Sequence, residues 1–176
     1  MRKAPLQVLR WSLVFMTAAW ILAPAAEPAR TVLVVRHAER AAGGMNADVG
    51  ISAAGQCRAE NLARLLADAG VKRIYVTEVV RTQQTAAPLA KKLNIRPEVV
   101  PSNNVDELVG KLRAEPPGGL ALVVTHGATL PDIISRLGGG TVPPIGDDEY
   151  DRLLVVTLTG PNQASVVLLR YAGCGR

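Results

Sequence analysis

The sequence is poor in aromatic residues: one Phe, two Trp and three Tyr make up 3% of its 176 residues. Proteins that hold single-stranded nucleic acid stack the bases on exposed aromatic side chains, so this scarcity argues against that function. Both tryptophans, Trp11 and Trp20, lie in the first twenty positions, and the interior therefore has to be built from Val, Leu, Ile and Ala. The length and the 48% hydrophobic content fit one globular domain with one core.

Several catalytic signatures are also missing. The chain has no GxSxG motif of serine hydrolases and no GxxxxGKS/T phosphate loop. Its two cysteines, Cys57 and Cys174, have neither CxxC nor zinc-ligand spacing. We therefore expect no metal, no cofactor and no cysteine nucleophile. The cysteines can form a disulfide in an oxidising compartment or remain separate thiols, and the sequence leaves both open.

The amino terminus has the pattern of a secretory signal peptide. Three basic residues in the first ten positions precede an uncharged apolar stretch over 11–23, and small residues follow. This stretch is short for a bilayer core of about 30 Å, although an uncleaved membrane anchor is the alternative. We predict a signal peptide at 1–25, one mature domain at 26–176, a periplasmic or secreted location and no stable membrane insertion after cleavage.

The predicted signal peptide accounts for much of the positive charge. The whole chain carries a formal net charge of +5, from 20 Lys and Arg against 15 Asp and Glu. Removing 1–25 takes away three basic residues and no acidic ones, which leaves +2. The charge is thus no evidence for a polyanionic partner, and we expect no nucleic acid among the partners.

Apolar runs alternate with helical patterns through the rest of the chain. Strands are expected at 31–36, 71–76, 96–100, 120–125, 152–159 and 165–171, the last two as a hairpin. Helices are expected at 52–69, 80–93, 105–114 and 130–137. This order predicts an α/β fold, a three-layer α/β/α sandwich around a mostly parallel central sheet.

The two histidines of the chain share one local context. His37 and His126 each come directly after an apolar strand. Ligands of open α/β sheets bind beyond the carboxyl ends of the strands, so the two imidazoles can face one crevice if their strands are neighbours. A pair of buried loop histidines is the alternative, and it is weaker for the pair than for either residue alone.

Two arginines are expected at the same edge of the sheet. Arg36 precedes the first histidine, and Arg81 lies at the start of the helix after the second strand. Guanidinium groups match phosphate oxygens in pairs, and a histidine can attack phosphorus, so the set suits a phosphoryl group. A solvated arginine at a helix start is the alternative for Arg81.

These residues resemble the histidine phosphatase superfamily, also called phosphoglycerate mutase-like. The Arg-His-Ala-Glu run at 36–39 is similar to the Arg-His-Gly signature, in the form found among small bacterial members. Stretches at 51–55, 81–86 and 125–131 resemble later motifs of the family in the same order. The resemblance implies the phosphoglycerate mutase-like fold and a metal-independent phosphoric monoester hydrolase of the histidine acid phosphatase type.

The resemblance also implies roles for the four basic residues. His37 would attack phosphorus in line and carry a phosphohistidine that water then hydrolyses. Arg36, Arg81 and His126 would bind the phosphate oxygens. The chain departs from many relatives after the second histidine, where Gly127, Ala128 and Thr129 replace a Ser-Asn-Thr run and an asparagine contact is absent.

The proton donor for the leaving group stays open. Relatives often place a carboxylate after the third strand, where this chain has Asp106 and Glu107, and we favour Asp106 weakly. A solvated acid that complements the helix dipole is the ordinary explanation for this position. Glu39, in the first motif, is another candidate.

Size and expected export favour a phosphatase of the cell envelope over a glycolytic mutase, whose longer insertions are missing. The partner would be a small phosphorylated substrate or an envelope phosphosugar, such as a phosphate on a lipopolysaccharide core sugar. One alternative is a non-catalytic module that binds phosphate or phosphosugar. Another is a scaffold or interaction protein on the same fold.

Overall fold

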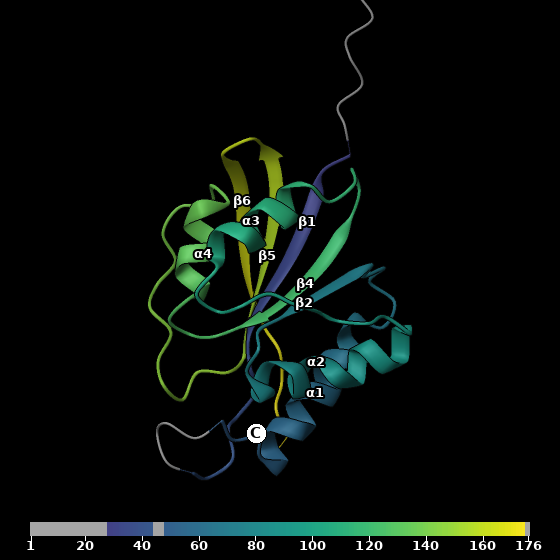
Figure 1. Cartoon of the computed structure of the whole chain (residues 1–176), viewed down its shortest axis with the longest axis vertical. Coiled ribbons are helices and arrows are strands. Elements are labelled where there is room, and N and C mark those ends of the chain that lie inside the picture. The colour runs from purple at the N-terminus through teal and green to yellow at the C-terminus, as the bar shows by residue number, and fades with distance from the viewer. Residues whose placement is uncertain (1–27, 44–47, 175–176) are drawn as a thin grey trace, which may run out of the picture.

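A computed structural model describes residues 28–43 and 48–174, and in this part of the chain strands and helices alternate (Figure 1). The strands are β1 (Arg30–Arg36), β2 (Arg73–Val76), β3 (Glu98–Val99), β4 (Leu120–Thr125), β5 (Arg152–Gly160) and β6 (Gln163–Arg170). The helices are α1 (Ala53–Leu66), α2 (Val80–Leu93), α3 (Val105–Arg113) and α4 (Leu130–Arg136). The signal peptide predicted at 1–25 lies outside the described residues.

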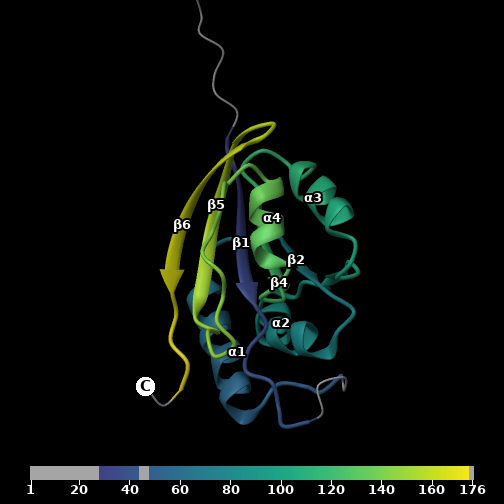
Figure 2. The ribbon, with the colours of Figure 1, turned by 90° about the vertical axis from the view of Figure 1, so that its left-hand side faces the viewer.

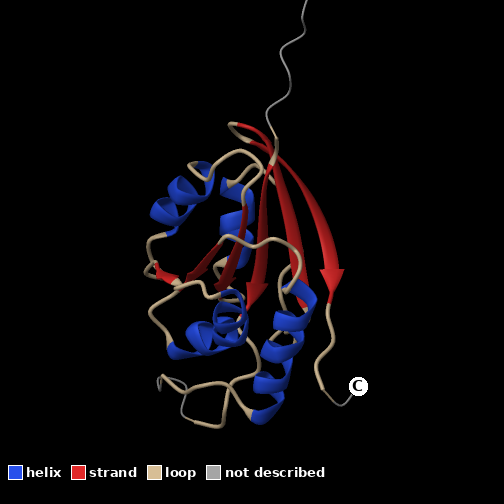
Figure 3. Cartoon of the chain, turned by 90° about the vertical axis from the view of Figure 1, so that its right-hand side faces the viewer, coloured by secondary structure: helices blue, strands red, loops and turns tan. Residues whose placement is uncertain are grey.

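The strands form one sheet in the order β3-β2-β4-β1-β5-β6 (Figure 3). The pairs β3–β2, β2–β4 and β4–β1 are parallel, whereas β1–β5 and β5–β6 are antiparallel. The last two strands form the expected hairpin, which closes where Gly160 pairs with Gln163. The prediction of a mostly parallel sheet is confirmed, with the antiparallel pairs confined to the hairpin side.

Two helices cover each face of the sheet, which confirms the three-layer sandwich (Figure 2). On β1, Val32 and Val34 pack in the core beneath α3 and α4, while Leu33 and Val35 pack in the core beneath α1 and α2. A strand buried on both faces needs apolar residues at every position, and this explains the unbroken apolar run in the sequence. No helix in the described residues is long and apolar enough to cross a membrane.

The helix starts follow local chemistry. Ser52 caps α1, since its side chain accepts a hydrogen bond of 3.1 Å from the backbone N–H of Gly55. Pro131 lies in the first turn of α4, where a missing N–H costs nothing. The start of α2 has no cap from an adjacent residue, but the distant Asp48 carboxylate accepts from the backbone N–H of Val80 at 3.1 Å.

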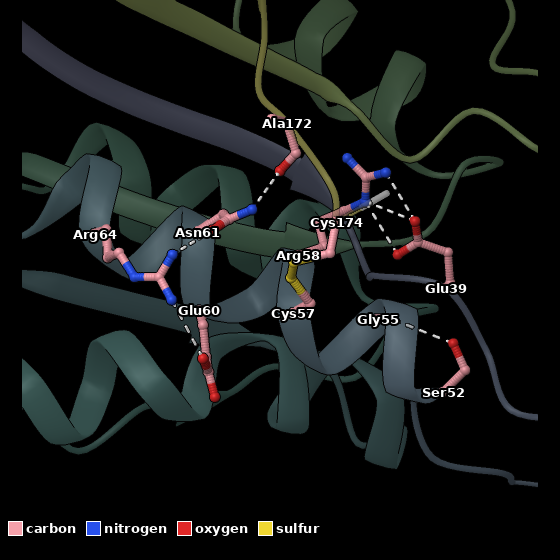
Figure 4. Close-up of a disulfide and its surroundings, with 10 residues drawn as sticks. All are labelled: Glu39, Ser52, Gly55, Cys57, Arg58, Glu60, Asn61, Arg64, Ala172 and Cys174. Atoms are coloured by element: carbon pink, nitrogen blue, oxygen red, sulfur yellow. Dashed lines mark hydrogen bonds and ion pairs between the residues drawn. A yellow bond between two sulfur atoms is a disulfide. The ribbon is translucent and has the colours of Figure 1, made fainter. Parts of the chain in front are cut away.

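A disulfide joins Cys57 in α1 to Cys174 in the tail after β6 (Figure 4). The two Cα atoms are 5.8 Å apart, although the residues are 117 positions apart in sequence. The alternative of two separate thiols is therefore set aside. Arg58 is buried beside this bridge, and its Nη1 donates to the backbone carbonyl of Tyr171 at 3.1 Å. The bridge and this hydrogen bond hold the tail against α1.

Candidate active site

The two histidines meet because their strands are neighbours. In the parallel pair β1–β4, Arg36 lies opposite Thr125, so the next residues, His37 and His126, leave the sheet side by side. The backbone N–H of His37 donates to the carbonyl of Thr125 at 2.8 Å. The two imidazole centroids are 5.5 Å apart, with an angle of 63° between the rings. The expected convergence at one edge of the sheet is present.

The arginines complete a cationic hollow. Arg81 lies in the first turn of α2, which follows β2, the other neighbour of β4. Arg36, His37, Arg81 and His126 all line one hollow of about 610 Å³. The buried Nε atoms of Arg36 and Arg81 have no hydrogen-bond partner in the described part of the chain. Buried donors of this kind need an acceptor, and the oxygens of an anion such as phosphate are the best match.

Its surroundings keep the imidazole of His37 neutral. Its Nδ1 lies 2.8 Å from the backbone oxygen of Ala38, and because a carbonyl can only accept, Nδ1 carries the proton. The lone pair of Nε2 is thus left for reaction. Burial lowers the pKa of His37 from 6.5 to about 4; the Ala38 hydrogen bond opposes this in part, and the charges of Arg36 and Arg81 add to it. An imidazole with this pKa is neutral at physiological pH and can attack phosphorus.

His126 is oriented by Thr77, which precedes α2, and Thr77 is in turn bonded to Thr82 in the first turn of that helix. Its Nε2 lies 3.1 Å from the hydroxyl of Thr77, which is 3.0 Å from the hydroxyl of Thr82. Burial lowers the pKa of His126, and the positive charges of Arg81 and Arg36 act in the same direction. The hydrogen bond with Thr77 orients the ring, and the lowered pKa favours its neutral form.

The hydroxyl of Thr85 connects the segment that follows His37 to α2. It accepts from the backbone N–H of Ala38 at 2.9 Å and donates to the carbonyl of Arg81 at 2.7 Å. The buried side chain of Thr85 therefore fixes the backbone at Ala38 and at Arg81. The sequence predicted a role for Arg81 in the 81–86 stretch but no positioning role for Thr85.

The loop before β5 is a part of the site that sequence reasoning missed. Arg36 Nη1 donates to three carbonyl oxygens of this loop, those of Gly146, Asp147 and Glu149, at 2.8, 2.9 and 3.3 Å. The guanidinium carbon also lies 4.2 Å from the centroid of the Tyr150 ring, a cation–π contact. The one available signal was Tyr150 itself, an isolated aromatic residue in a loop rich in Gly and Asp.

Neither predicted proton donor lies in the hollow. The carboxylate of Asp106 is on the first turn of α3 as expected, but it pairs with Arg136 of α4 and its side chain is 85% exposed. The carboxylate of Glu39 accepts from Arg58 Nε at 2.9 and 3.0 Å and from Nη2 at 2.7 Å (Figure 4). Asp147 is the single carboxyl residue among the described residues that line the hollow.

The side chains that line the hollow differ from those of a metal site. Within 28–43 and 48–174, no group of three or more His, Cys, Asp or Glu side chains gathers closely enough to hold a metal ion. The hollow is instead lined by two histidines and three arginines, the third being Arg40. Such a donor-rich lining suits an anion.

Comparison with known structures agrees with this fold. The protein histidine phosphatase SixA, solved with tungstate, superposes with a TM-score of 0.65 at 20% identity over 81% of this chain and 96% of that one. A mycobacterial glucosyl-3-phosphoglycerate phosphatase gives 0.63 at 14% identity, over 81% and 98%. The alpha-ribazole phosphatase of Shigella flexneri gives 0.63 at 16%, over 80% and 96%. At these identities the likeness is one of fold.

The sequence comparison points to one family. Residues 32–108, less than half of the chain, match the model of the histidine phosphatase superfamily (branch 1), a segment that holds Arg36, His37 and Arg81 but ends before His126. This part of the chain is thus similar to the histidine phosphatase superfamily, and its fold is the fold of the phosphatases named above. A stretch of 56 residues is also 45% identical to part of the PE-PGRS family protein PE_PGRS11 of Mycobacterium tuberculosis. That stretch is 31% of this chain, which spans only 10% of that relative.

Proposed function

We propose that the protein is a metal-independent phosphatase that hydrolyses phosphate monoesters through a phosphohistidine on His37. The observation that carries the proposal is a neutral, buried histidine beside two arginines whose buried Nε atoms lack a partner among the described residues. The family and the phosphatases that share the fold support it.

The reaction proceeds in two displacements. The lone pair of His37 Nε2 attacks phosphorus in line, the ester P–O bond breaks, and the leaving oxygen keeps the bonding pair and takes a proton from solvent. Water then attacks the phosphohistidine and gives a proton back to solvent, the P–N bond breaks with its electron pair returning to Nε2, and inorganic phosphate and neutral His37 are released. Arg36, Arg81 and His126 hold the phosphate oxygens throughout. Removing one such preorganised donor typically costs about a hundredfold to a thousandfold in rate.

The place of action proposed for the protein is the periplasm or the exterior of the cell. The signal-like pattern of 1–25 supports export, and a disulfide between Cys57 and Cys174 is typical of oxidising compartments. The mature unit would then be the domain at 26–176, acting on small phosphorylated compounds that reach this compartment.

Phosphate release from an aryl phosphate tests the proposal. The protein and His37→Ala are compared in excess chelator, with circular dichroism to show that both are folded, and samples quenched in alkali are examined for a phosphoryl label that is stable in alkali and lost in acid. We expect chelator-resistant release and a label, both lost in the variant. Equal release by both proteins would remove His37 as the nucleophile. Phosphate binding without release would favour the non-catalytic binding module.

A further inference from the structure

We propose that the ester cleaved at this site carries an apolar leaving group, an alkyl or aryl group in place of a polyhydroxylated sugar. The inference rests on the proposed function and adds the class of substrate. The hollow is cationic where Arg36 and Arg81 lie beside the two neutral histidines, and a separate set of lining residues forms an apolar wall. This wall consists of Ala128, Pro131, Val142, Pro144 and Ile145.

The wall is built from two segments of the fold. Ala128 and Pro131 belong to the turn and first residues of α4, directly after His126. The other three lie in the loop before β5, where Ile145 packs against the core beneath α3 and α4. Since both segments flank the phosphate-binding groups, a leaving group attached to a phosphate in the hollow meets apolar surface.

The described lining offers little to a sugar. Apart from the two histidines, it contains no aromatic side chain that could pack on a sugar ring, and it contains no Asn, Gln, Ser or Thr that could pair with hydroxyls. The polar side chains of the lining outside the proposed phosphate cradle are Arg40 and Asp147. A sugar would lose water from several hydroxyls here and regain few hydrogen bonds, which disfavours its binding.

The wall is held in place before any ligand binds. Arg152 is buried, and its guanidinium donates to the carbonyls of Pro143 and Pro144 at 2.8 and 3.0 Å. The same guanidinium donates to the Glu149 carboxylate at 2.7 and 2.6 Å. These charge-assisted bonds fix the loop, so an apolar group that contacts it pays little to order it.

The hollow has room for more than a phosphate. Its volume of about 610 Å³ lies within the range of small-molecule sites, so a leaving group of several carbons fits beside the phosphate. A methylene that moves from water to this wall improves binding by up to roughly fourfold. Alkyl phosphates of increasing chain length therefore measure how much the apolar wall contributes to binding.

The test is a homologous series of ethyl, butyl and hexyl phosphate, with glycerol 1-phosphate as the hydroxylated comparison. The leaving alcohols of the series have nearly equal acidity, so chemistry is constant while apolar area grows. We expect kcat/KM to rise by about tenfold or more from ethyl to hexyl phosphate, and glycerol 1-phosphate to be the poorest substrate. Val142→Thr keeps the shape of the side chain, and Ile145→Thr removes one methyl group as well; each should lower the hexyl-to-ethyl ratio by about threefold.

Val167→Thr is the matched control. It makes the same kind of change on β6 at a residue that is 54% exposed and does not line the hollow, so the ratio should stay as in the unchanged protein. A flat series with His37-dependent phosphate release would overturn the inference and leave the proposed function intact. A rising series unchanged by both wall variants would also overturn it. Loss of His37-dependent release for every ester, aryl phosphate included, would overturn the proposed function itself.

Discussion

Acid should destabilise the protein through His37 in a window set by two pKa values. Burial and the neighbouring arginines lower the pKa of His37 to about 4 in the folded protein, against the ordinary 6.5 in the unfolded chain. Below about pH 6.5 the unfolded chain therefore takes up a proton that the folded protein does not. The free energy of unfolding falls as the pH decreases, and the loss ends near pH 4, below which both states are protonated.

The size of the effect follows from the difference between the two pKa values. The lowering of the His37 pKa contributes about 3 kcal/mol to the free energy of unfolding at neutral pH, and about 2 kcal/mol of this contribution is lost by about pH 5. His37 is only 5% exposed, so solvent screens little of this penalty. The loss is large beside the total stability of an ordinary domain, which is roughly 5–15 kcal/mol.

Urea unfolding of the protein and of His37→Gln at about pH 7 and about pH 5 measures the effect. Glutamine does not titrate, so the difference in unfolding free energy between the two proteins should shift by about 2 kcal/mol between these pH values. Carboxylates and His126 are present in both proteins, and their contributions largely cancel. The buffer must lack phosphate, because a ligand of the folded state would stabilise it. Parallel behaviour of the two proteins would refute a buried, neutral His37.

Three further predictions concern the site and its frame. Arg36→Ala should lower kcat on an aryl phosphate by about a hundredfold or more, because it removes a preorganised donor, and a loss below about fivefold would contradict that role. Replacing Cys57 and Cys174 by serine should lower the free energy of unfolding in urea by about 2–5 kcal/mol, since the bridge closes a long loop, and unchanged stability would show that the bridge contributes nothing. Asp106→Asn should leave kcat for alkyl and aryl phosphates within about twofold, because this carboxylate pairs with Arg136 at the surface. A selective loss of alkyl phosphate turnover would instead identify Asp106 as the proton donor.

The central elements of the fold were predictable because their sequences carry the burial pattern. The expected 80–93 and 120–125 segments agree with α2 and β4 residue for residue. The edges were harder to predict. The strand expected at 96–100 is reduced to Glu98–Val99, since β3 lies at the edge of the sheet and pairs only with the end of β2. The helix expected to reach 69 ends at Leu66, where a turn leads to Gly70 with a φ of +82°. Where pairing and helix stop is decided by tertiary contacts that local pattern does not encode.

The cationic half of the site was predictable for a related reason. Neighbouring parallel strands end at the same edge of a sheet, so the sequence alone predicts that the residues directly after their apolar runs lie close together. The loop before β5 could not be found in this way, because Arg36 binds it through backbone carbonyls, which every residue possesses. Only the contact with Tyr150 involves a distinctive side chain.

Glu39 lies two positions after His37 in the first motif, but its contacts are structural. On sequence alone its carboxylate is a candidate proton donor, because it lies so near His37. In the structure its oxygens are engaged by the guanidinium of Arg58, which is buried and also bonded to the carbonyl of Tyr171. Gly173 packs so closely on this guanidinium that an added Cβ would lie 2.6 Å from Nη2. The residue that engages Glu39 is thus held by a tail more than a hundred positions away, and adjacency in sequence cannot reveal such a partner. The loop that carries Glu39, α1 and the C-terminal tail are therefore joined through Arg58.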